Sequence, residues 1–460
     1  MRILCRRRVV TFGKAAGWGL ATVAIVVVAF LGFRGTRRAA SFARTMAPAA
    51  TVPGTRAERA PHPSLIYGRI LTVDGVTFEG RLRWGGNQEA FWGDYFNGVK
   101  SVNPWAGYVP PEQLPKESRP IVIFGLEIAH REGPLDLSRN FMARFGDIAR
   151  LDASTAEVKV TLKSGSRFVL NRYSSSDFDD GVQVWDSRQG VKLLDTLRIR
   201  TIEFLPGPPA GGSVDRLYGT VRTKQGEEFR GFLQWDREQC LGSDLLTGEA
   251  DGAEGSIRFD AVRSIARRSG NDAVVTLLDG REVVLTGERG FQKDRRGVYI
   301  DDPRYGRVLV SWTAFVRVEF AAGGDGPAYG DFPPGGPLQG SVTTRDGRRL
   351  SGRLVYDLDE SEFTDTLDAP SQGVTYTIPF GLIASIVRSD AGEKAAECGT
   401  VTLWSGEALH PACAGDLGRE NAGALIFGGA QQQPEYVPWA NIGHVELDRP
   451  PAIYPPTGKR

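Results

Sequence analysis

The chain has 460 residues, of which 56 are Lys or Arg and 55 are Asp or Glu, so its formal net charge is only +1. Residues 1–60 contain eleven of the basic residues but a single acid, Glu58, which leaves 45 basic and 54 acidic residues for the rest of the chain. A body with this acidic excess disfavours nucleic-acid binding, which requires a basic face. The length indicates several domains, and four cysteines are too few for a disulfide scaffold.

The N-terminal region predicts a membrane anchor. Residues 15–33 carry no charge, and as a helix they would span about 28 Å, close to the thickness of the hydrocarbon core. We expect residues 1–14 to form a basic cytoplasmic head and residues 15–33 a transmembrane signal anchor in the inner membrane, with the body extracytoplasmic. A cleaved signal peptide and a secreted body are the alternative. Residues 34–63, rich in Ala, Pro and Arg, predict a flexible tether.

The stretch from residue 219 to 236, GTVRTKQGEEFRGFLQWD, predicts a β-hairpin that recurs along the chain. Apolar residues alternate at a period of two on both sides of a central glycine, which indicates two strands with one buried face. The symmetry about the glycine favours a three-residue loop in which the glycine adopts a positive φ. The six central glycines are Gly75, Gly165, Gly226, Gly280, Gly347 and Gly406.

A second pattern follows each hairpin, consisting of an aromatic residue and two apolar residues at steps of three. It predicts a short 3₁₀ turn that leads into a closing strand. From the glycine to the last apolar residue the spacing is 37 to 39 residues in five copies and 76 in the first. The first copy therefore carries an insertion, at residues 92–141. The copies are Phe145/Ile148/Leu151, Thr196/Ile199/Ile202, Phe259/Val262/Ile265, Trp312/Phe315/Val318, Phe380/Ile383/Ile386 and Trp439/Ile442/Val445, the second having Thr in place of the aromatic.

Hairpin, middle strands, 3₁₀ turn and closing strand together resemble the SH3-like and Sm-like small β-barrels. The similarity is greatest in the fifth copy, where the residues of the first Sm motif are Gly347, Arg348, Leu350, Gly352 and Leu354. Glu362 stands near the place of the asparagine that contacts RNA in Sm proteins, and no Arg-Gly pair precedes Ile383. The resemblance therefore implies a fold and not a specific family.

The copies alternate in type and predict an all-β chain of six small barrels arranged as three pairs. The first, third and fifth copies have Thr three residues before the glycine and Gly five residues after it, whereas the others have Leu before it and Leu or Pro after it. We expect pairs at residues 64–205, 214–320 and 338–448, because two packed barrels bury more apolar surface than one copy of about 50 residues. A Pro-rich tail follows at residues 449–460.

The insertion contains the candidate binding residues. Aromatic side chains crowd its start, and prolines stiffen the loop that follows. Exposed aromatics on such a loop are suited to binding a glycan or another protein. The alternative is that they cover one end of their own barrel. The candidates are Trp92, Tyr95, Phe96, Trp105 and Tyr108.

The cysteines leave one structural question open. Cys398 and Cys413 flank the last hairpin and could form a disulfide, but the strand register places them on opposite faces unless a bulge near Pro411 realigns them. Cys240 is expected to be a buried thiol. The spacings between the cysteines do not match those of a zinc site.

No motif predicts catalysis, a metal site or a cofactor. The sequence lacks metalloprotease, nucleophile-elbow, phosphate-loop and dinucleotide signatures. The acidic clusters at residues 176–180 and 357–360 are expected to be solvated turns. The aromatics at repeat positions are expected to be core, namely Trp84, Trp235, Trp312, Tyr356 and Trp439.

Repetition without a catalytic signature favours a non-enzymatic binding or scaffold protein of the cell envelope, anchored in the membrane and contacting an envelope protein or a glycan. One alternative is an enzyme that acts on the cell wall or on carbohydrate through a site that the sequence does not reveal. Another is a cytoplasm-facing, Sm-like nucleic-acid binder.

Overall fold

The computed structural model describes residues 62–450 apart from twelve short gaps. These gaps are residues 86–87, 115, 124–125, 135–138, 175–180, 210–214, 237–238, 251–252, 269–271, 287–296, 390–397 and 430–432. The predicted anchor at residues 15–33, nearly all of the tether and nearly all of the tail lie outside the described residues, as does the acidic cluster at residues 176–180. Among the helices of the described part, none is long and apolar enough to cross a bilayer.

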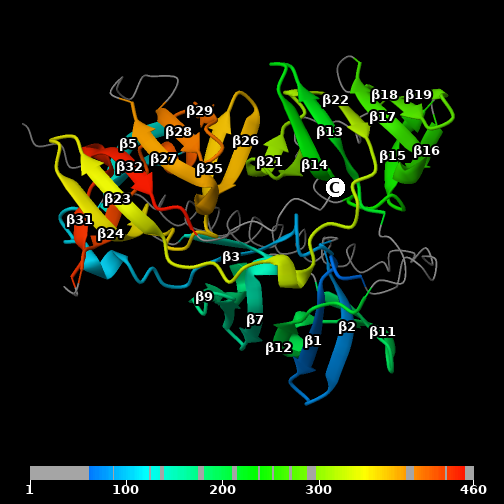
Figure 1. Cartoon of the computed structure of the whole chain (residues 1–460), viewed down its shortest axis with the longest axis horizontal. Coiled ribbons are helices and arrows are strands. Elements are labelled where there is room, and N and C mark those ends of the chain that lie inside the picture. Colours follow the sequence, from blue (N-terminus) through cyan, green and yellow to red (C-terminus); the bar gives the residue numbers. More distant parts are fainter. Residues whose placement is uncertain are drawn as a thin grey trace, which may run out of the picture. The chain divides into compact units, whose positions relative to one another are not determined.

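The described residues form an all-β structure, as predicted, and their only helical elements are single 3₁₀ turns. Three large antiparallel sheets contain 8, 10 and 8 strands (Figure 1). Each sheet is built around two consecutive sequence copies. We therefore name the first module (residues 62–205), the second module (residues 215–320) and the third module (residues 337–448).

Apart from the hairpin β4–β5, which lies in the insertion of the first module, the strands follow one another in the same order in each module. The first module contains β1 (Tyr67–Thr72), β2 (Thr77–Trp84), β3 (Tyr95–Val99), β4 (Lys116–Ile123), β5 (Leu126–Pro134), β6 (Asn140–Arg144), β7 (Ile148–Ala153), β8 (Glu157–Leu162), β9 (Arg167–Asn171), β10 (Val182–Asp186), β11 (Gly190–Leu194) and β12 (Ile199–Phe204). The second contains β13 (Tyr218–Thr223), β14 (Glu228–Trp235), β15 (Leu245–Ala250), β16 (Ala253–Arg258), β17 (Val262–Arg267), β18 (Ala273–Leu277), β19 (Glu282–Leu285), β20 (Val298–Asp302), β21 (Gly306–Val310) and β22 (Phe315–Phe320). The third contains β23 (Gln339–Thr344), β24 (Arg349–Tyr356), β25 (Thr366–Ser371), β26 (Val374–Pro379), β27 (Ile383–Arg388), β28 (Gly399–Leu403), β29 (Ala408–Leu409), β30 (Ala424–Phe427), β31 (Glu435–Val437) and β32 (Ile442–Leu447).

Within each module the two sequence copies exchange strands. In the first module, β1 pairs with β2 and with β12, which is the closing strand of the other copy. Strand β2 then pairs with β10, which also belongs to the other copy. The pairs β13–β22 and β14–β20 repeat this arrangement in the second module, and the pairs β23–β32 and β24–β30 repeat it in the third.

This exchange differs from the expected six closed barrels. The outermost strands of each large sheet do not pair with each other, so none of the described sheets closes. A single copy of about 50 residues would bury too little apolar surface for a stable core. The exchanged sheet solves this problem differently from two packed barrels, because one core contains side chains of both copies, such as Phe78 and Val160.

The turn of each hairpin has the predicted backbone conformation. All six central glycines have positive φ, from 83° at Gly75 to 89° at Gly165, Gly280 and Gly406. The threonine three residues before the glycine stabilises the turn in the odd copies. The hydroxyl Oγ1 of Thr72 accepts a hydrogen bond from the N–H of Val76 at 3.0 Å, and equivalent bonds occur at Thr223 and Thr344.

The glycine five residues after the turn is required by the strand exchange. A Cβ atom at Gly80 would lie 2.0 Å from the carbonyl oxygen of Trp185 on β10. The corresponding distances are 2.0 Å at Gly231, to the carbonyl oxygen of Asp301, and 2.1 Å at Gly352. Only glycine admits so close an approach of two strands. The alternation of Gly with Leu or Pro in the sequence therefore marks which hairpin receives the exchanged strand.

The 3₁₀ turns before the closing strands are confirmed in five of the six copies. They are η3 (Phe145–Asp147), η5 (Thr196–Arg198), η6 (Phe259–Ala261), η8 (Phe380–Leu382) and η10 (Trp439–Asn441). In the fourth copy, Trp312 begins an ordinary turn before β22. The aromatics at the repeat positions are buried core residues, as predicted: Trp84, Trp235, Trp312, Tyr356 and Trp439 are at most 6% exposed.

The cysteines take two different states. Cys240 is a buried thiol outside any disulfide, as predicted, and burial raises its pKa above the ordinary value. Cys398 and Cys413 form a disulfide with a Cα–Cα distance of 4.7 Å. Strand β29 ends at Leu409, and the N–H of Cys398 donates to the carbonyl of Pro411 at 3.3 Å. The regular ladder therefore stops before Pro411, and the regular register no longer keeps the two cysteines apart.

Candidate functional site

The structure places three of the five candidate aromatics in the interior. Trp92, Tyr95 and Phe96 are 5%, 3% and 0% exposed. Phe96 packs against Trp84 in the core of the first module, with ring centroids 6.0 Å apart. These three side chains offer no surface to an external ligand.

Trp105 and Tyr108 lie at the 3₁₀ turn η2 (Ala106–Tyr108) and contact the third module. Their ring centroids lie 6.0 Å and 5.8 Å from that of Phe427 on β30. The guanidinium of Arg353 lies 5.2 Å from the centroid of the Trp105 ring. Tyr108 remains 46% exposed. The insertion thus covers another part of its own chain.

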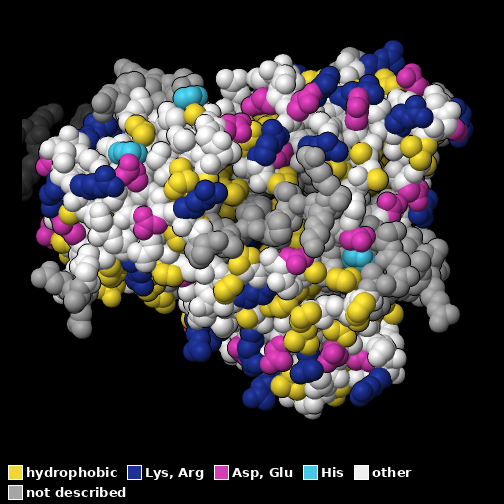
Figure 2. Space-filling view, in the orientation of Figure 1, with side chains coloured by type: hydrophobic (Ala, Val, Ile, Leu, Met, Phe, Trp, Pro, Cys, Tyr) yellow, Lys and Arg dark blue, Asp and Glu magenta, His cyan; other side chains and the backbone are white. Residues whose placement is uncertain are grey.

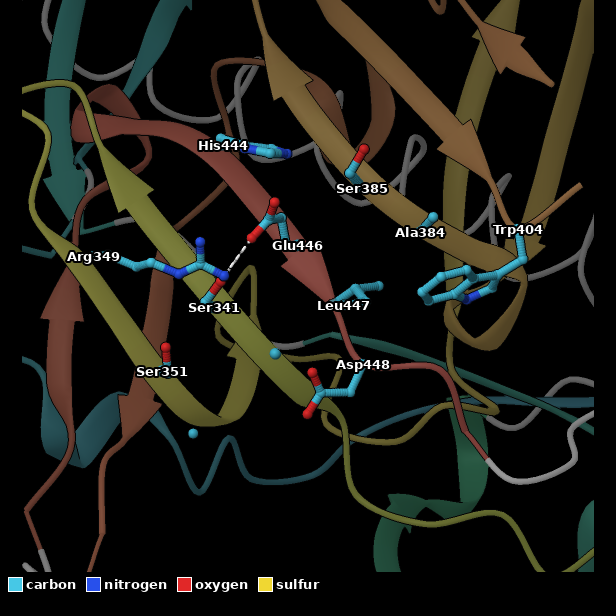
Figure 3. Close-up of a pocket in the computed structure, with 12 residues that line it drawn as sticks. Ser341, Arg349, Ser351, Ala384, Ser385, Trp404, His444, Glu446, Leu447 and Asp448 are labelled. Atoms are coloured by element: carbon cyan, nitrogen blue, oxygen red, sulfur yellow. Dashed lines mark hydrogen bonds and ion pairs between the residues drawn. The ribbon is translucent and has the colours of Figure 1, made fainter. Parts of the chain in front are cut away.

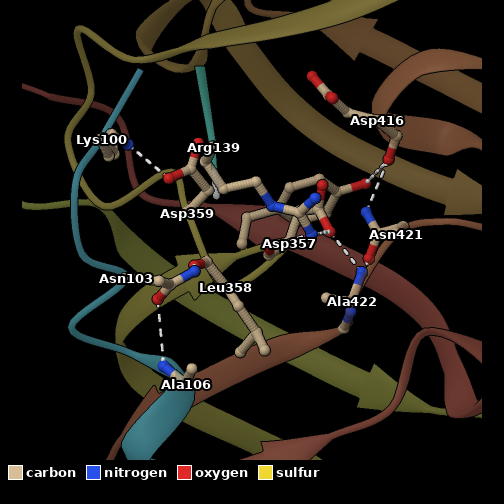
Figure 4. A network of polar contacts seen from close by, with 12 residues as sticks. Lys100, Asn103, Ala106, Arg139, Asp357, Leu358, Asp359, Asp416, Asn421 and Ala422 are labelled. Atoms are coloured by element: carbon tan, nitrogen blue, oxygen red, sulfur yellow. Dashed lines mark hydrogen bonds and ion pairs between the residues drawn. The ribbon is translucent and has the colours of Figure 1, made fainter. Parts of the chain in front are cut away.

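Charged residues extend this contact (Figure 4). Lys100 forms a buried ion pair with Asp359, and Arg139 pairs with Asp357 at 3.3 Å. The side-chain amide of Asn103 donates to the carbonyl oxygen of Leu358 at 3.0 Å. We call the segment that makes this contact, residues 100–114 together with Arg139, the clasp.

The acidic cluster at residues 357–360 is therefore not a solvated turn, and that prediction is wrong. Asp357 and Asp359 are each 7% exposed and Glu360 is 9% exposed, and Arg139 and Lys100 of the clasp pair with the two aspartates. Burial raises the pKa of Asp357 to about 7 and raises that of Glu360 well above its ordinary value. In the part of the chain that the structure describes, no group of three or more His, Cys, Asp or Glu residues could hold a metal ion.

A different surface distinguishes the three modules. We call the central row the four side chains that lie side by side across the first hairpin and the two closing strands of each module. In the first module the row is Glu79, Arg69, Glu203 and Arg150. In the second it is Arg230, Thr220, Glu319 and Ser264. In the third it is Ser351, Ser341, Glu446 and Ser385. All three rows share one glutamate and differ in its neighbours.

Ion pairs fill the central row of the first module. Arg150 contacts Glu203 at 2.6 Å, and Arg69 contacts Glu79 at 2.9 Å and Glu203 at 3.8 Å. In the second module, Arg317 contacts Glu319 at 3.0 Å and donates to the hydroxyl of Ser264 at 3.1 Å. A long cationic side chain therefore lies beside the glutamate in both modules, from the row itself in the first and from Arg317 on the same strand in the second.

The third module has an open groove at the same place, because its three serines are short (Figure 3). The groove has a volume of about 490 Å³. Arg349 and Trp404 lie on opposite sides of it, and Glu446 lies between them, paired with Arg349. The hydroxyl of Ser341 donates to the carboxylate of Glu446 at 3.3 Å. His444 and Asp448 complete the polar lining.

The groove combines an aromatic wall with clustered hydrogen-bonding groups. Trp404 is half-buried on the turn between β28 and β29, and the guanidinium of Arg449 lies 5.6 Å from its ring centroid. In the first module the residue at the equivalent position is Lys163, two residues before the turn glycine. An indole face opposite a guanidinium, a carboxylate and three hydroxyls can contact both faces of a small polar ligand.

A second pocket, of about 390 Å³, lies where the second module meets the third. Two tyrosines there donate to carboxylates across the junction: Tyr305 to Glu407, and Tyr376 to Glu227 at 3.1 Å. Because the polar groups of these residues bind one another, we interpret the pocket as part of the junction between the second and third modules.

The sequence interpretation missed the groove, although a signal was present. Alignment of the three odd hairpins at their turn glycine places Glu79, Arg230 and Ser351 at one position. This alignment alone shows one serine in place of a long charged residue. The rest of the groove appears only when the closing strands are also aligned, since Ser385 and Glu446 lie far away in the sequence. No protein-family model matches the chain, and neither a curated protein nor a solved structure is significantly similar to it.

Proposed function

We propose that this chain is a membrane-anchored, extracytoplasmic binding protein of the cell envelope, and that the groove of its third module binds a carbohydrate. The observation that carries the proposal is the central row. Equivalent positions hold ion pairs in the first module, whereas the third module has serines beside Glu446 and an indole at the rim.

The chemistry of a sugar fits this lining. The apolar face of a pyranose ring stacks on an indole, and its hydroxyls are both donors and acceptors. Arg349 supplies donors, Glu446 and Asp448 supply acceptors, and the serines supply both. The groove volume of about 490 Å³ is of the size of ordinary small-ligand sites.

The location outside the cytoplasm rests on three observations. Residues 15–33 form an uncharged stretch long enough to span a membrane, and the chain after residue 60 has an acidic excess. The disulfide between Cys398 and Cys413 favours an oxidising compartment. Protease treatment of cells carrying a C-terminal tag tests this location. Cleavage before the inner membrane is breached supports it, and protection until that point contradicts it.

Carbohydrate binding is tested by titrating the full-length protein with cell-envelope oligosaccharides and following its tryptophan fluorescence. Trp404→Ala should weaken binding by at least about tenfold, since aromatic anchors dominate the energetics of such contacts. Trp185→Ala is the matched control, because Trp185 is a half-buried tryptophan on β10 of the first module. Equal binding by both variants would remove the groove from the proposal.

A second candidate function is carbohydrate hydrolysis. Glu446 and Asp448 are two residues apart at the end of β32 and both line the groove, which provides two carboxylates on one surface. Release of reducing ends from a bound oligosaccharide, lost in Glu446→Gln, would favour the enzyme. Binding without turnover would favour the binding protein.

A further inference from the structure

Strand β11 lies at the edge of the sheet of the first module, whereas the equivalent strand of the second module pairs with a further strand. Strand β11 is the last strand of its sheet and, among the strands that the structure describes, pairs only with β10. In the second module the equivalent strand, β21, pairs with β20 on one side and with β26 of the third module on the other. The two strands correspond residue by residue, from Gly190 with Gly306 to Leu194 with Val310.

The pairing with β26 buries the side chains of β21. Val308 and Val310 on β21 are 0% exposed, and Tyr376 of the incoming strand lies opposite Val308. Tyr376 packs against Phe229, with ring centroids 5.8 Å apart. The incoming strand therefore completes the core of the second module at its edge.

The same edge of the first module is exposed. Leu193 is 75% exposed and Val191 is 47% exposed, although both are apolar residues within a strand. Hydrophobic side chains gather on the face of the first module over β2 and β11 (Figure 2). An edge strand with free main-chain groups and exposed apolar side chains is a template for a further strand.

Lys192 determines which kind of strand can pair with β11. Lys192 is exposed, but it lies opposite the fully buried Val184 on β10, so it is on the face of the sheet that covers the core. Its equivalent on β21 is Val308, which faces Tyr376. An inward-facing lysine on an edge strand opposes pairing with a purely apolar strand. A strand with a carboxylate at the position of Tyr376 would pair with the lysine instead.

We propose that β11 is a docking edge for an extended strand of a partner protein, which pairs antiparallel in the register that β26 uses on β21. The partner strand carries Asp or Glu opposite Lys192 and small or β-branched residues opposite Val191 and Leu193. In the internal precedent, Thr377 and Thr375 hold these last two positions, opposite Arg307 and Leu309.

The test uses the full-length protein and fluorescent peptides of residues 370–380, which contain β26. Three peptides carry Tyr, Glu (Y376E) or Lys (Y376K) at position 376, and binding is followed by fluorescence anisotropy. The Glu peptide should bind at least tenfold more tightly than the Lys peptide. Lys192→Glu should invert this preference, which also distinguishes β11 from competition at β21.

Two controls separate strand pairing from simple charge attraction. Lys224→Glu, at an exposed lysine in the second module, should leave the order of the peptides unchanged. A Glu peptide with methylated main-chain nitrogens should lose binding, because pairing requires its N–H donors. Absence of binding, or an order that Lys192→Glu does not change, would overturn the proposal. So would a dimer of the chain that Lys192→Glu abolishes, since the edge would then serve a second copy.

Discussion

The first and third modules share a strand order and a central row, but they use the row differently. In the first module, Arg69 and Arg150 pair with the glutamates beside them and fill the surface. In the third, Ser341 and Ser385 leave a groove beside Glu446. The strand pairing is equivalent in both, so the difference lies in the side chains: serines replace the arginines of the row, and Trp404 replaces Lys163. The comparison teaches that the repeat determines the scaffold, while a few positions on its surface determine whether a groove is open.

The shared scaffold gives the largest expected effect. Gly352→Ala should destabilise the third module by about 3 kcal/mol, because the new Cβ would meet the carbonyl of Phe427 and the φ of +150° suits only glycine. Gly80→Ala should cost the first module roughly 1–3 kcal/mol, because there the overlap acts without the unusual φ. Hydrogen exchange, read separately for the strands of each module, measures both effects.

Gly255→Ala is the control for these substitutions, since a Cβ at that position meets no atom within 4 Å. If Gly352→Ala is no more destabilising than this control, the tight strand exchange in the third module is incorrect.

Because the clasp pairs with buried acidic residues, we expect the stability of the third module to depend on pH. Burial raises the pKa of Asp357 to about 7 in the folded chain, compared with about 3.8 for an ordinary Asp. A carboxyl with a raised pKa holds its proton in the folded state, so its stabilising effect is full below pH of about 4 and is lost as the pH rises through about 7. We expect the folded third module, with the clasp in place, to lose stability between about pH 4 and 7.

Asp357→Asn should remove much of this dependence and raise the midpoint of thermal unfolding at pH 8. The amide keeps an acceptor for the N–H of Ala422, which donates to Asp357 in the folded chain. Asn also tolerates the φ of 50° at this position. A thermal midpoint of Asp357→Asn that falls with pH as steeply as that of the wild type would contradict this assignment of the titrating group.

The smallest effect is expected from opening the row of the first module. Arg150→Ser should change the free energy of unfolding by less than about 1 kcal/mol, because Arg150 and Glu203 are 42% and 38% exposed. It should not create carbohydrate binding, since Lys163 stands where the third module has Trp404. Chemical denaturation and oligosaccharide titration check the two statements. Binding gained by this single change would show that the indole is dispensable.

Much of the scaffold could be predicted from repetition. The positive φ of Gly75 and the 3₁₀ turn at Phe145 follow from local patterns that occur six times, so each copy supports the others. The strand exchange could not be predicted, because the alternation of buried residues in β1 suits pairing with either closing strand. Gly80, like Gly231 and Gly352 in the other modules, marks where another strand passes close, and its meaning depends on the contact with Trp185.

The burial of the acidic residues and the groove both depend on contacts between distant parts of the chain. Asp357 and Asp359 look like a solvated turn in sequence, and they are buried because Lys100 pairs with Asp359 across 259 positions. The groove is formed by serines from separate strands, each of which is unremarkable alone. Sequence patterns report local periodicity well, but they do not report which surfaces meet.

The most direct test of the central claim is to copy the row of the first module onto the third. The full-length Ser341→Arg/Ser385→Arg variant would place arginines on both sides of Glu446, as Arg69 and Arg150 flank Glu203. If the groove binds carbohydrate as proposed, titration with cell-envelope oligosaccharides should show an affinity at least about a hundredfold lower than that of the wild type, with an unchanged hydrogen-exchange pattern in the third module. Unchanged affinity would contradict the claim that the open row is the binding site.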